Sequence, residues 1–199
     1  MTRRRENTQA RLLEAAHEVF AEVGLGAASV EAICERAGFT RGAFYSNFES
    51  KDELFLALIT QLADDKLDEV AGRVKGLSGS GDDPVHLVRQ IADVSLAERM
   101  EPQLLSEIRT QALRDERLAE AFLAWREQIH ARVESLIGDV ADVYGFRLRL
   151  PIPDAARLLM DVSEETTARC ALERRSREES SAALQSRLEQ LVTLLVDPS

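Results

Sequence analysis

The stretch that decides the fold, residues 29–54, reads SVEAICERAGFTRGAFYSNFESKDEL. Ser29 is a favoured N-cap residue and predicts a short helix behind it. The apolar side chains expected on the buried face of that helix are Val30, Ile33, Cys34 and Ala37. Gly38 breaks the helix, because a residue without a Cβ lets the chain reverse tightly. Thr40 then caps another short helix, which runs to about Asn47.

Longer helices are expected on both sides of this stretch. The helix before it has one apolar face at helical spacing, formed by Leu12, Ala15, Ala16, Val19, Phe20 and Val23. Gly24 is expected to end that first helix. Downstream, Ser50 and Glu53 have the spacing of a capping box and open a long helix. The apolar face of the long helix comprises Leu54, Phe55, Leu58, Ile59 and Leu62.

Two short helices joined by a glycine turn behind an amphipathic helix form the helix-turn-helix arrangement, here over about residues 29–48. In this arrangement the second short helix is the recognition helix, and its first turn enters the major groove of DNA. Arg41 in that turn can reach guanine edges or phosphate, and Gly42 lets the backbone come close to the duplex. Phe44 and Phe48 are spaced to lock the helix into the core.

The residues after this first turn offer groups for flanking phosphates. Tyr45, Asn47 and Lys51 supply a hydroxyl, an amide and an ammonium group. Other roles stay open for three of the candidates. Tyr45 can pack against the first helix, Asn47 can cap the recognition helix, and Arg41 can be a solvated surface residue. Cys34, on an apolar face, is expected in the core.

The net charge of −10 is distributed unevenly along the chain. Residues 1–51 carry seven basic and seven acidic side chains, whereas residues 52–199 carry 18 basic and 28 acidic ones. A neutral N-terminal segment can approach phosphates while the acidic remainder repels them. Three of the N-terminal basic residues, Arg3, Arg4 and Arg5, form an arm that either contacts DNA or is a disordered terminus.

The composition and pattern of the whole chain predict an all-α protein of about nine helices. Ala, Leu, Glu and Arg dominate, and these residues favour helix. The Gly/Ser-rich residues 76–84 predict a loop. Further helical patterns occur at about 84–98, 102–113, 116–144, 154–175 and 179–196. Residues 146–152 alternate weakly, which is compatible with a short extended segment.

The segment from about Arg11 to Leu56 resembles the DNA-binding domain of the tetracycline-repressor (TetR) family. The family pattern has an Ala-Gly turn, then Gly-x-x-Tyr, a Phe and finally Lys-(acidic)-(acidic)-Leu, and all of these occur here at matching spacing. Asn47 departs from the pattern, because the family very often has His at that position. The remainder of the chain matches only in length and helical content.

The resemblance implies an Ω-like nine-helix protomer, a symmetric dimer, and repression that a ligand relieves. It divides the chain into a DNA-binding domain at 1–50 and a ligand-binding and dimerisation domain at 51–199. The residues expected to contact DNA are Ser29, Thr40, Arg41, Gly42, Tyr45, Asn47 and Lys51, with the Arg3, Arg4 and Arg5 arm. The expected partners are palindromic double-stranded operator DNA, a second copy of the chain and a small-molecule effector; no cofactor is expected.

The C-terminal helices supply candidates for the dimer interface and for the effector pocket. The interface candidates are Leu158, Leu159, Val162, Leu184, Leu188, Leu191 and Leu195, although their periodicity is equally compatible with an intramolecular core. The pocket candidates are His86, Arg109, Phe122, Trp125, His130, Glu164, Thr167 and Cys170. Phe122 and Trp125 can instead be core residues, and the polar stretch 163–167 can be a solvated face. A pocket with apolar walls and few polar groups suits a hydrophobic or aromatic effector.

Several other protein classes do not fit the sequence. No apolar run is long enough to cross a bilayer, so no membrane segment is expected and the expected compartment is the cytoplasm, at the nucleoid. Cys34 and Cys170 are expected to be reduced and packed. The histidines and cysteines lack the spacing of a metal site, and the common catalytic motifs are missing, so neither a metal sensor nor an enzyme is expected. An activator, or a DNA-binding protein without a ligand, stays open.

Overall fold

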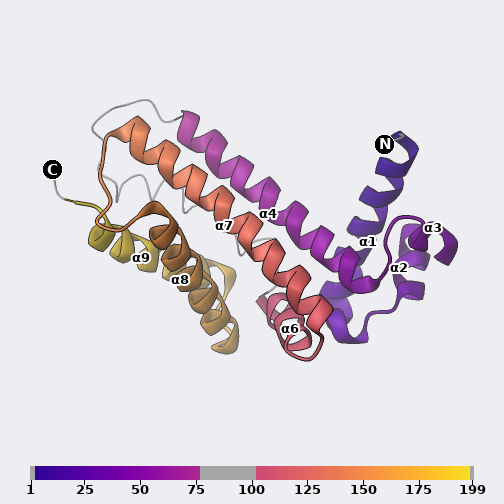
Figure 1. Ribbon diagram of the computed structural model, residues 1–199. Coiled ribbons are helices and arrows are strands. Elements are labelled where there is room, and N and C mark those ends of the chain that lie inside the picture. The colour runs from indigo at the N-terminus through magenta and orange to yellow at the C-terminus, as the bar shows by residue number, and fades with distance from the viewer. Residues whose placement is uncertain (1–2, 77–101, 198–199) are drawn as a thin grey trace. The chain divides into compact units, whose positions relative to one another are not determined.

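The structure is a computed structural model that describes residues 3–76 and 102–197 (Figure 1). Over those ranges it confirms the all-α prediction. The helices are α1 (Arg3–Ala27), α2 (Val30–Ala37), α3 (Arg41–Tyr45), α4 (Lys51–Gly76), α6 (Pro102–Ala112), α7 (Glu116–Tyr144), α8 (Ile152–Leu172) and α9 (Arg177–Leu195). The helix predicted at about 84–98 and nearly all of the loop predicted at 76–84 lie outside the described residues.

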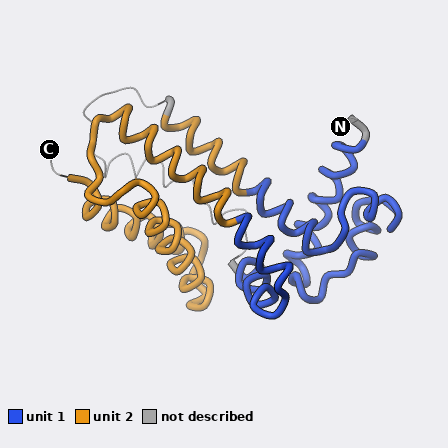
Figure 2. Tube along the Cα trace, viewed as in Figure 1, with its two compact units in different colours: residues 1–62, 103–125 blue, residues 63–102, 126–199 orange. Residues whose placement is uncertain are grey.

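The chain forms two compact units (Figure 2). The first comprises Met1–Leu62 and Gln103–Trp125, and the second Ala63–Pro102 and Arg126–Ser199. The first unit contains residues 51–62 and 103–125 in addition to the DNA-binding domain that the resemblance implies at 1–50. The start of α4 belongs to it because Phe55 is fully buried and its ring packs edge-on against Phe20 of α1, with the ring centroids 5.4 Å apart.

Helix α1 has the predicted buried face with one exception. The buried members of that face are Leu12, Ala15, Ala16, Val19 and Phe20. Val23 was also expected there, but this is wrong, because its side chain is 52% exposed. Val23 directly precedes a bend at Gly24, whose φ of 79° and ψ of 165° break the helical path inside α1. Beyond the bend Leu25 is completely buried and takes the next core position.

Local capping signals define α2 and α3. The Ser29 Oγ accepts a hydrogen bond from the Ala32 amide at 3.1 Å, and the Thr40 Oγ1 accepts one from the Ala43 amide at 3.2 Å. Gly38 ends α2 in the left-handed conformation, with φ of 70°. Helix α3 is shorter than predicted, since it ends at Tyr45 rather than near Asn47. We call α1 to α3 and α4 up to Leu62 the head.

The second unit is built around α8 and α9, which pack side by side (Figure 1). Helix α9 begins with a complete capping box, in which Ser176 and Glu179 bond to each other's backbone amides. Within residues 146–152, for which the sequence allowed a short extended segment, Leu148 forms an isolated antiparallel bridge with Val196, and α8 begins at Ile152. A small core cluster joins the end of α4 to the end of α7 through Val70, Val74 and Tyr144.

Candidate nucleic-acid interface

Helix α3 divides its side chains between the core and the surface. Phe44 is fully buried and Phe48 is 5% exposed, and their ring centroids are 6.0 Å apart. Tyr45, next to Phe44 in sequence, is 51% exposed. The two phenylalanines therefore anchor the helix, as the sequence predicted, while its other face is presented to solvent.

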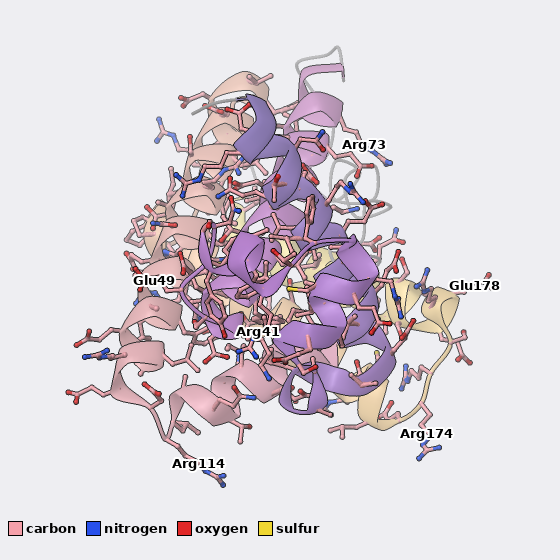
Figure 3. All side chains as sticks on the ribbon, turned by 90° about the vertical axis from the view of Figure 1, so that its right-hand side faces the viewer. Arg41, Glu49, Arg73, Arg114, Arg174 and Glu178 are labelled. Carbon is pink, nitrogen blue, oxygen red and sulfur yellow. The ribbon has the colours of Figure 1, made fainter. Side chains whose placement is uncertain are left out.

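Arg41 begins the exposed face of α3 (labelled in Figure 3). Its Nη1 lies 2.8 Å from the Glu31 carboxylate on α2, and its guanidinium carbon lies 5.9 Å from the Tyr45 ring centroid. Hydrogen bonding to Tyr45 and the charge of Glu31 raise the pKa of Arg41 above its ordinary value. Arg41 is thus exposed, but it is not a freely solvated arginine.

Gly42 is exposed and is not required by the packing of the head itself. A Cβ built on Gly42 meets only the Thr40 Oγ1, at 3.7 Å, which is an ordinary van der Waals contact. Its φ does not lie in the left-handed region that favours glycine. The bare backbone at this point leaves room for a second molecule to approach closely.

Lys51 and Asn47 are engaged within the head. The Lys51 Nζ donates hydrogen bonds to the carbonyl oxygens of Leu25 and Ala28, at 2.6 and 2.9 Å. The Asn47 Nδ2 donates to the Ala43 carbonyl at 2.7 Å, in agreement with the capping alternative. Within the described part of the chain, the buried Asn47 Oδ1 has no hydrogen-bond partner.

The basic arm is part of α1. The helix begins at Arg3, so the backbone of Arg3, Arg4 and Arg5 is helical rather than disordered. Arg5 is exposed. These residues lie in the first turn of α1, which begins nine residues before Leu12, the first member of its buried face.

Several ion pairs and hydrogen bonds that the sequence analysis did not single out hold the head together. Arg36 on α2 pairs with Glu18 and Glu22 on α1, at 2.8 and 2.9 Å. Arg11 on α1 donates to the Ala37 carbonyl at 2.8 Å. All of these partners are at least 14 residues apart in sequence, so local spacing gave no signal for them.

Helix α6 contacts the end of α1 within the first unit. The Glu107 Oε2 accepts a hydrogen bond from the Gly26 amide at 3.1 Å. A Cβ built on Gly24 would lie 2.9 Å from the Glu107 Oε1. The bend at Gly24 and the absence of a side chain there make room for this carboxylate.

Comparison with known proteins agrees with the helix-turn-helix geometry. Residues 12–58 match the family model of the bacterial regulatory proteins of the tetR family. The chain carries a TetR-type DNA-binding domain. Over 66 residues it is 41% identical to the uncharacterized HTH-type transcriptional regulator YvdT of Bacillus subtilis, a match that covers 33% of this chain. The chain spans about a third of the length of that relative, 34%.

Solved structures resemble the chain over nearly its whole length. A TetR-family transcriptional regulator from Mesorhizobium loti is 20% identical, with a TM-score of 0.71 and coverage of 98% of this chain and 99% of that one. The regulator FadR of Bacillus subtilis, solved in complex with stearoyl-CoA, is 17% identical, with a TM-score of 0.66 and coverage of 93% and 98%. At these identities the likeness shows a shared fold.

The pocket candidates do not all belong to one unit. Phe122 and Trp125 are buried in the first unit with their rings stacked at 5.4 Å, and the exposed Arg109 lies in the same unit. The candidates in the second unit are His130, Glu164, Thr167 and Cys170, and His86 lies outside the described residues. Both cysteines are free and buried, as expected.

Three of the second-unit candidates differ in what they contact. The two Glu164 carboxylate oxygens accept hydrogen bonds from the Arg126 Nη1, at 2.7 and 2.8 Å. The Thr167 Oγ1 donates to the Ser163 carbonyl of its own helix. His130 is 6% exposed, and its Nε2 has no hydrogen-bond partner among the described residues. Its Nδ1 lies 2.8 Å from the Glu134 Oε1 but outside the direction of a hydrogen bond.

The leucine stripe proposed as a dimer interface is split between core and surface. Leu184 and Leu195 are 6% and 5% exposed within one protomer, so they have little surface left for an outward-facing interface. Helices α8 and α9 pack on each other, and periodicity alone did not separate that contact from an external one. Leu158 is 38% exposed. The partly buried remainder comprises Leu159, Val162, Leu188 and Leu191.

Two further findings concern other classes of site. Within residues 3–76 and 102–197, no helix is long and apolar enough to cross a membrane. In the same ranges, no three His, Cys, Asp or Glu side chains gather in a way that would hold a metal ion.

Proposed function

We propose that the protein is a sequence-specific DNA-binding transcriptional regulator, acting in the cytoplasm as a repressor that a small-molecule effector releases from a palindromic operator. One observation carries this proposal: α3 is anchored by Phe44 and presents Arg41, Gly42 and Tyr45 outward. A short helix fixed on one face and polar on the other suits insertion into a major groove.

Each exposed group has a distinct part in the proposed complex. Arg41 contacts a base edge, Tyr45 donates its hydroxyl to a phosphate, and Gly42 admits the DNA backbone. The hydroxyl oxygens of Ser29 and Thr40 accept hydrogen bonds from backbone amides, so each hydroxyl proton is available to a phosphate. Lys51 and Asn47 support the head instead, because their donors bond to its carbonyls.

Reading a palindrome requires a two-fold dimer, which places two recognition helices in successive major grooves. We assign the interface to the outer faces of α8 and α9, around Leu158, Leu188 and Leu191. These side chains are only partly covered in the protomer, unlike Leu184. Partly covered leucines at helical spacing are suited to a four-helix interface.

The effector that we propose is hydrophobic or aromatic and carries a hydrogen-bonding group. The buried His130 Nε2, which has no partner among the residues that the structure describes, supports this, since an unsatisfied buried polar atom costs about 1–3 kcal/mol unless a ligand satisfies it. That FadR was solved with stearoyl-CoA supports an apolar effector for a fold of this kind. The effector can release DNA only to the extent that it binds the DNA-incompetent state more tightly.

The experiment that tests the proposal measures binding to DNA from upstream of the protein's own gene across a salt series. The R41A/Y45A variant is compared with R114A/E120A, which alters exposed residues of the first unit outside the head. We expect tight, salt-sensitive binding that only R41A/Y45A loses. Binding no tighter than to random DNA, followed by failure to select any site from random duplexes, would refute the DNA-binding function.

A second experiment tests the effector and the direction of regulation. Trp125 is the only tryptophan, so its fluorescence reports on compounds that bind near it or change its surroundings. Compounds found in this way are added to the protein–operator complex, and transcription from that operator is measured. Release of DNA with a rise in transcription supports a repressor, whereas a fall in transcription supports an activator.

A further inference from the structure

The ion pair between Glu31 and Arg41 joins the first turns of α2 and α3. The Arg41 Nη1 and the Glu31 Oε1 are 2.8 Å apart, and the two side chains are 61% and 59% exposed. An exposed pair of this kind contributes at most about 1 kcal/mol to folding. The head therefore does not depend on Glu31 for its stability.

A carboxylate at this place needs an explanation if the surface faces DNA. Phosphates repel an acidic side chain, so a carboxylate beside the recognition helix weakens binding unless DNA offers it a donor. In the major groove the donors are the amino groups of cytosine and adenine, and Glu is suited to the N4 amine of cytosine. The Glu31 carboxylate contacts Arg41 through Oε1, and because a carboxylate has about four acceptor sites it can also accept this hydrogen bond.

Arg41 is fixed on two sides and keeps donors to spare. Glu31 holds its Nη1, and the ring of Tyr45 lies beneath the guanidinium. Arginine has five N–H donors in a rigid fork, and the remaining ones can reach the O6 and N7 acceptors of guanine. Such a pair presents donors and an acceptor side by side, which matches the acceptor, acceptor, donor pattern of a G·C base pair.

We infer that Glu31 is a specificity-determining residue, which acts with Arg41 to select a G·C base pair, with Arg41 on the guanine and Glu31 on the cytosine amine. This inference rests on the proposed DNA-binding function. In an A·T base pair, adenine places an amino donor where Arg41 needs an acceptor, and thymine offers no amino donor to Glu31. The two side chains therefore discriminate against A·T.

Selection of binding sites from random duplexes tests the inference. Wild type, E31A, E31Q and R41A are compared with E35A, which changes an exposed glutamate one turn further along α2. Affinities for the selected site and for its G·C→A·T derivative are then measured for each variant. Circular dichroism and thermal unfolding confirm that each variant is folded.

Wild type and E35A are expected to prefer the G·C site by about tenfold or more, and E31A to lose most of that preference while still binding DNA. E31Q retains an acceptor oxygen and is expected to fall between them. An E31A selection profile identical to that of wild type would overturn the inference alone. A gain in the affinity of E31A for all sequences alike would also overturn it, since Glu31 would then only weaken the attraction of Arg41 to DNA. Absence of any selected site with wild type would refute the proposed function itself, and the inference with it.

Discussion

The Glu107 carboxylate on α6 accepts the backbone hydrogen of Gly26, two residues beyond the bend that Gly24 makes at the end of α1. The bend has a backbone conformation, φ of 79° and ψ of 165°, that is essentially restricted to glycine. The contact therefore joins α6 to the segment that leads into the helix-turn-helix, and it depends on a missing side chain.

Replacing Gly24 by alanine is expected to destabilise the protein by about 1–3 kcal/mol. The new Cβ is strained by the positive φ and lies 2.9 Å from the Glu107 Oε1. Urea unfolding measures the change, and G26A is the matched control, because a Cβ on Gly26 meets nothing within 4 Å. Equal losses in G24A and G26A would show that neither the bend nor the carboxylate is the cause.

Removing the Glu107 carboxylate is expected to expose the Gly26 amide. In E107A this amide loses its acceptor, so its hydrogen should exchange faster with solvent. The increase in exchange rate should correspond to the about 0.5–1.5 kcal/mol that such a hydrogen bond contributes. Amide exchange followed by NMR gives the measurement, with E120A as a control on an exposed glutamate. Unchanged exchange at Gly26 would contradict the hydrogen bond.

Lys51 is expected to contribute to stability rather than to make its main contact with phosphate. K51M removes charge-assisted hydrogen bonds to the Leu25 and Ala28 carbonyls, for an expected loss of about 1–3 kcal/mol in the free energy of unfolding. R114M serves as the control at an exposed position. If K51M unfolds like wild type but binds every DNA sequence more weakly, the phosphate contact indicated by the sequence is the correct one.

The Arg36–Glu22 pair predicts a pH-dependent part of the stability. Hydrogen bonding and the charge of Arg36 hold the pKa of Glu22 below its ordinary value of 4.5. A lowered pKa stabilises the fold above the ordinary value, and this stabilisation disappears as the pH falls through the lower, folded-state pKa. The difference in unfolding free energy between wild type and E22Q should therefore be constant near neutral pH and shrink to zero in acid. A difference that instead grows in acid would contradict the direction of the shift, and E14Q on the same helix is the control.

The split leucine stripe predicts two distinct mutant phenotypes. L184A leaves a cavity inside the protomer and should reduce the free energy of unfolding by about 2–4 kcal/mol. L191E places a charge on the proposed interface and should shift the protein toward monomers in light scattering, with weaker operator binding. L113E, at a position that is 83% exposed, is the control and should change neither property. Dimer dissociation by L184A without loss of stability would return Leu184 to the interface.

The sequence predicted the head in detail wherever the signal was local. Ser29 and Thr40 cap the helices that follow them, through bonds to amides three residues ahead. Gly38 takes the left-handed conformation expected at the end of α2. Such signals depend on neighbouring residues alone, so a single sequence contains them.

Contacts between distant residues were the part that sequence could not supply. The carbonyl partners of Lys51 are 26 and 23 residues away in sequence, and they are its neighbours only in the folded chain. Periodicity likewise marked Leu184 and Leu191 as one apolar stripe without indicating which of them is buried within the protomer. An apolar stripe shows that one side of a helix is buried, but it does not identify the element that covers this side.

The short bridge between Leu148 and Val196 closes the C-terminal helices into a ring. The Arg149 amide donates to the Leu195 carbonyl at 2.7 Å, and the Asp197 amide donates to the Arg147 carbonyl at 2.9 Å. The two ends of the α8–α9 hairpin are therefore fastened together. A pulling force applied at Asp197 would act first on these two hydrogen bonds and only afterwards on the helical hydrogen bonds of α9. Mechanical unfolding of the α8–α9 hairpin from this end should therefore begin with breakage of the bridge.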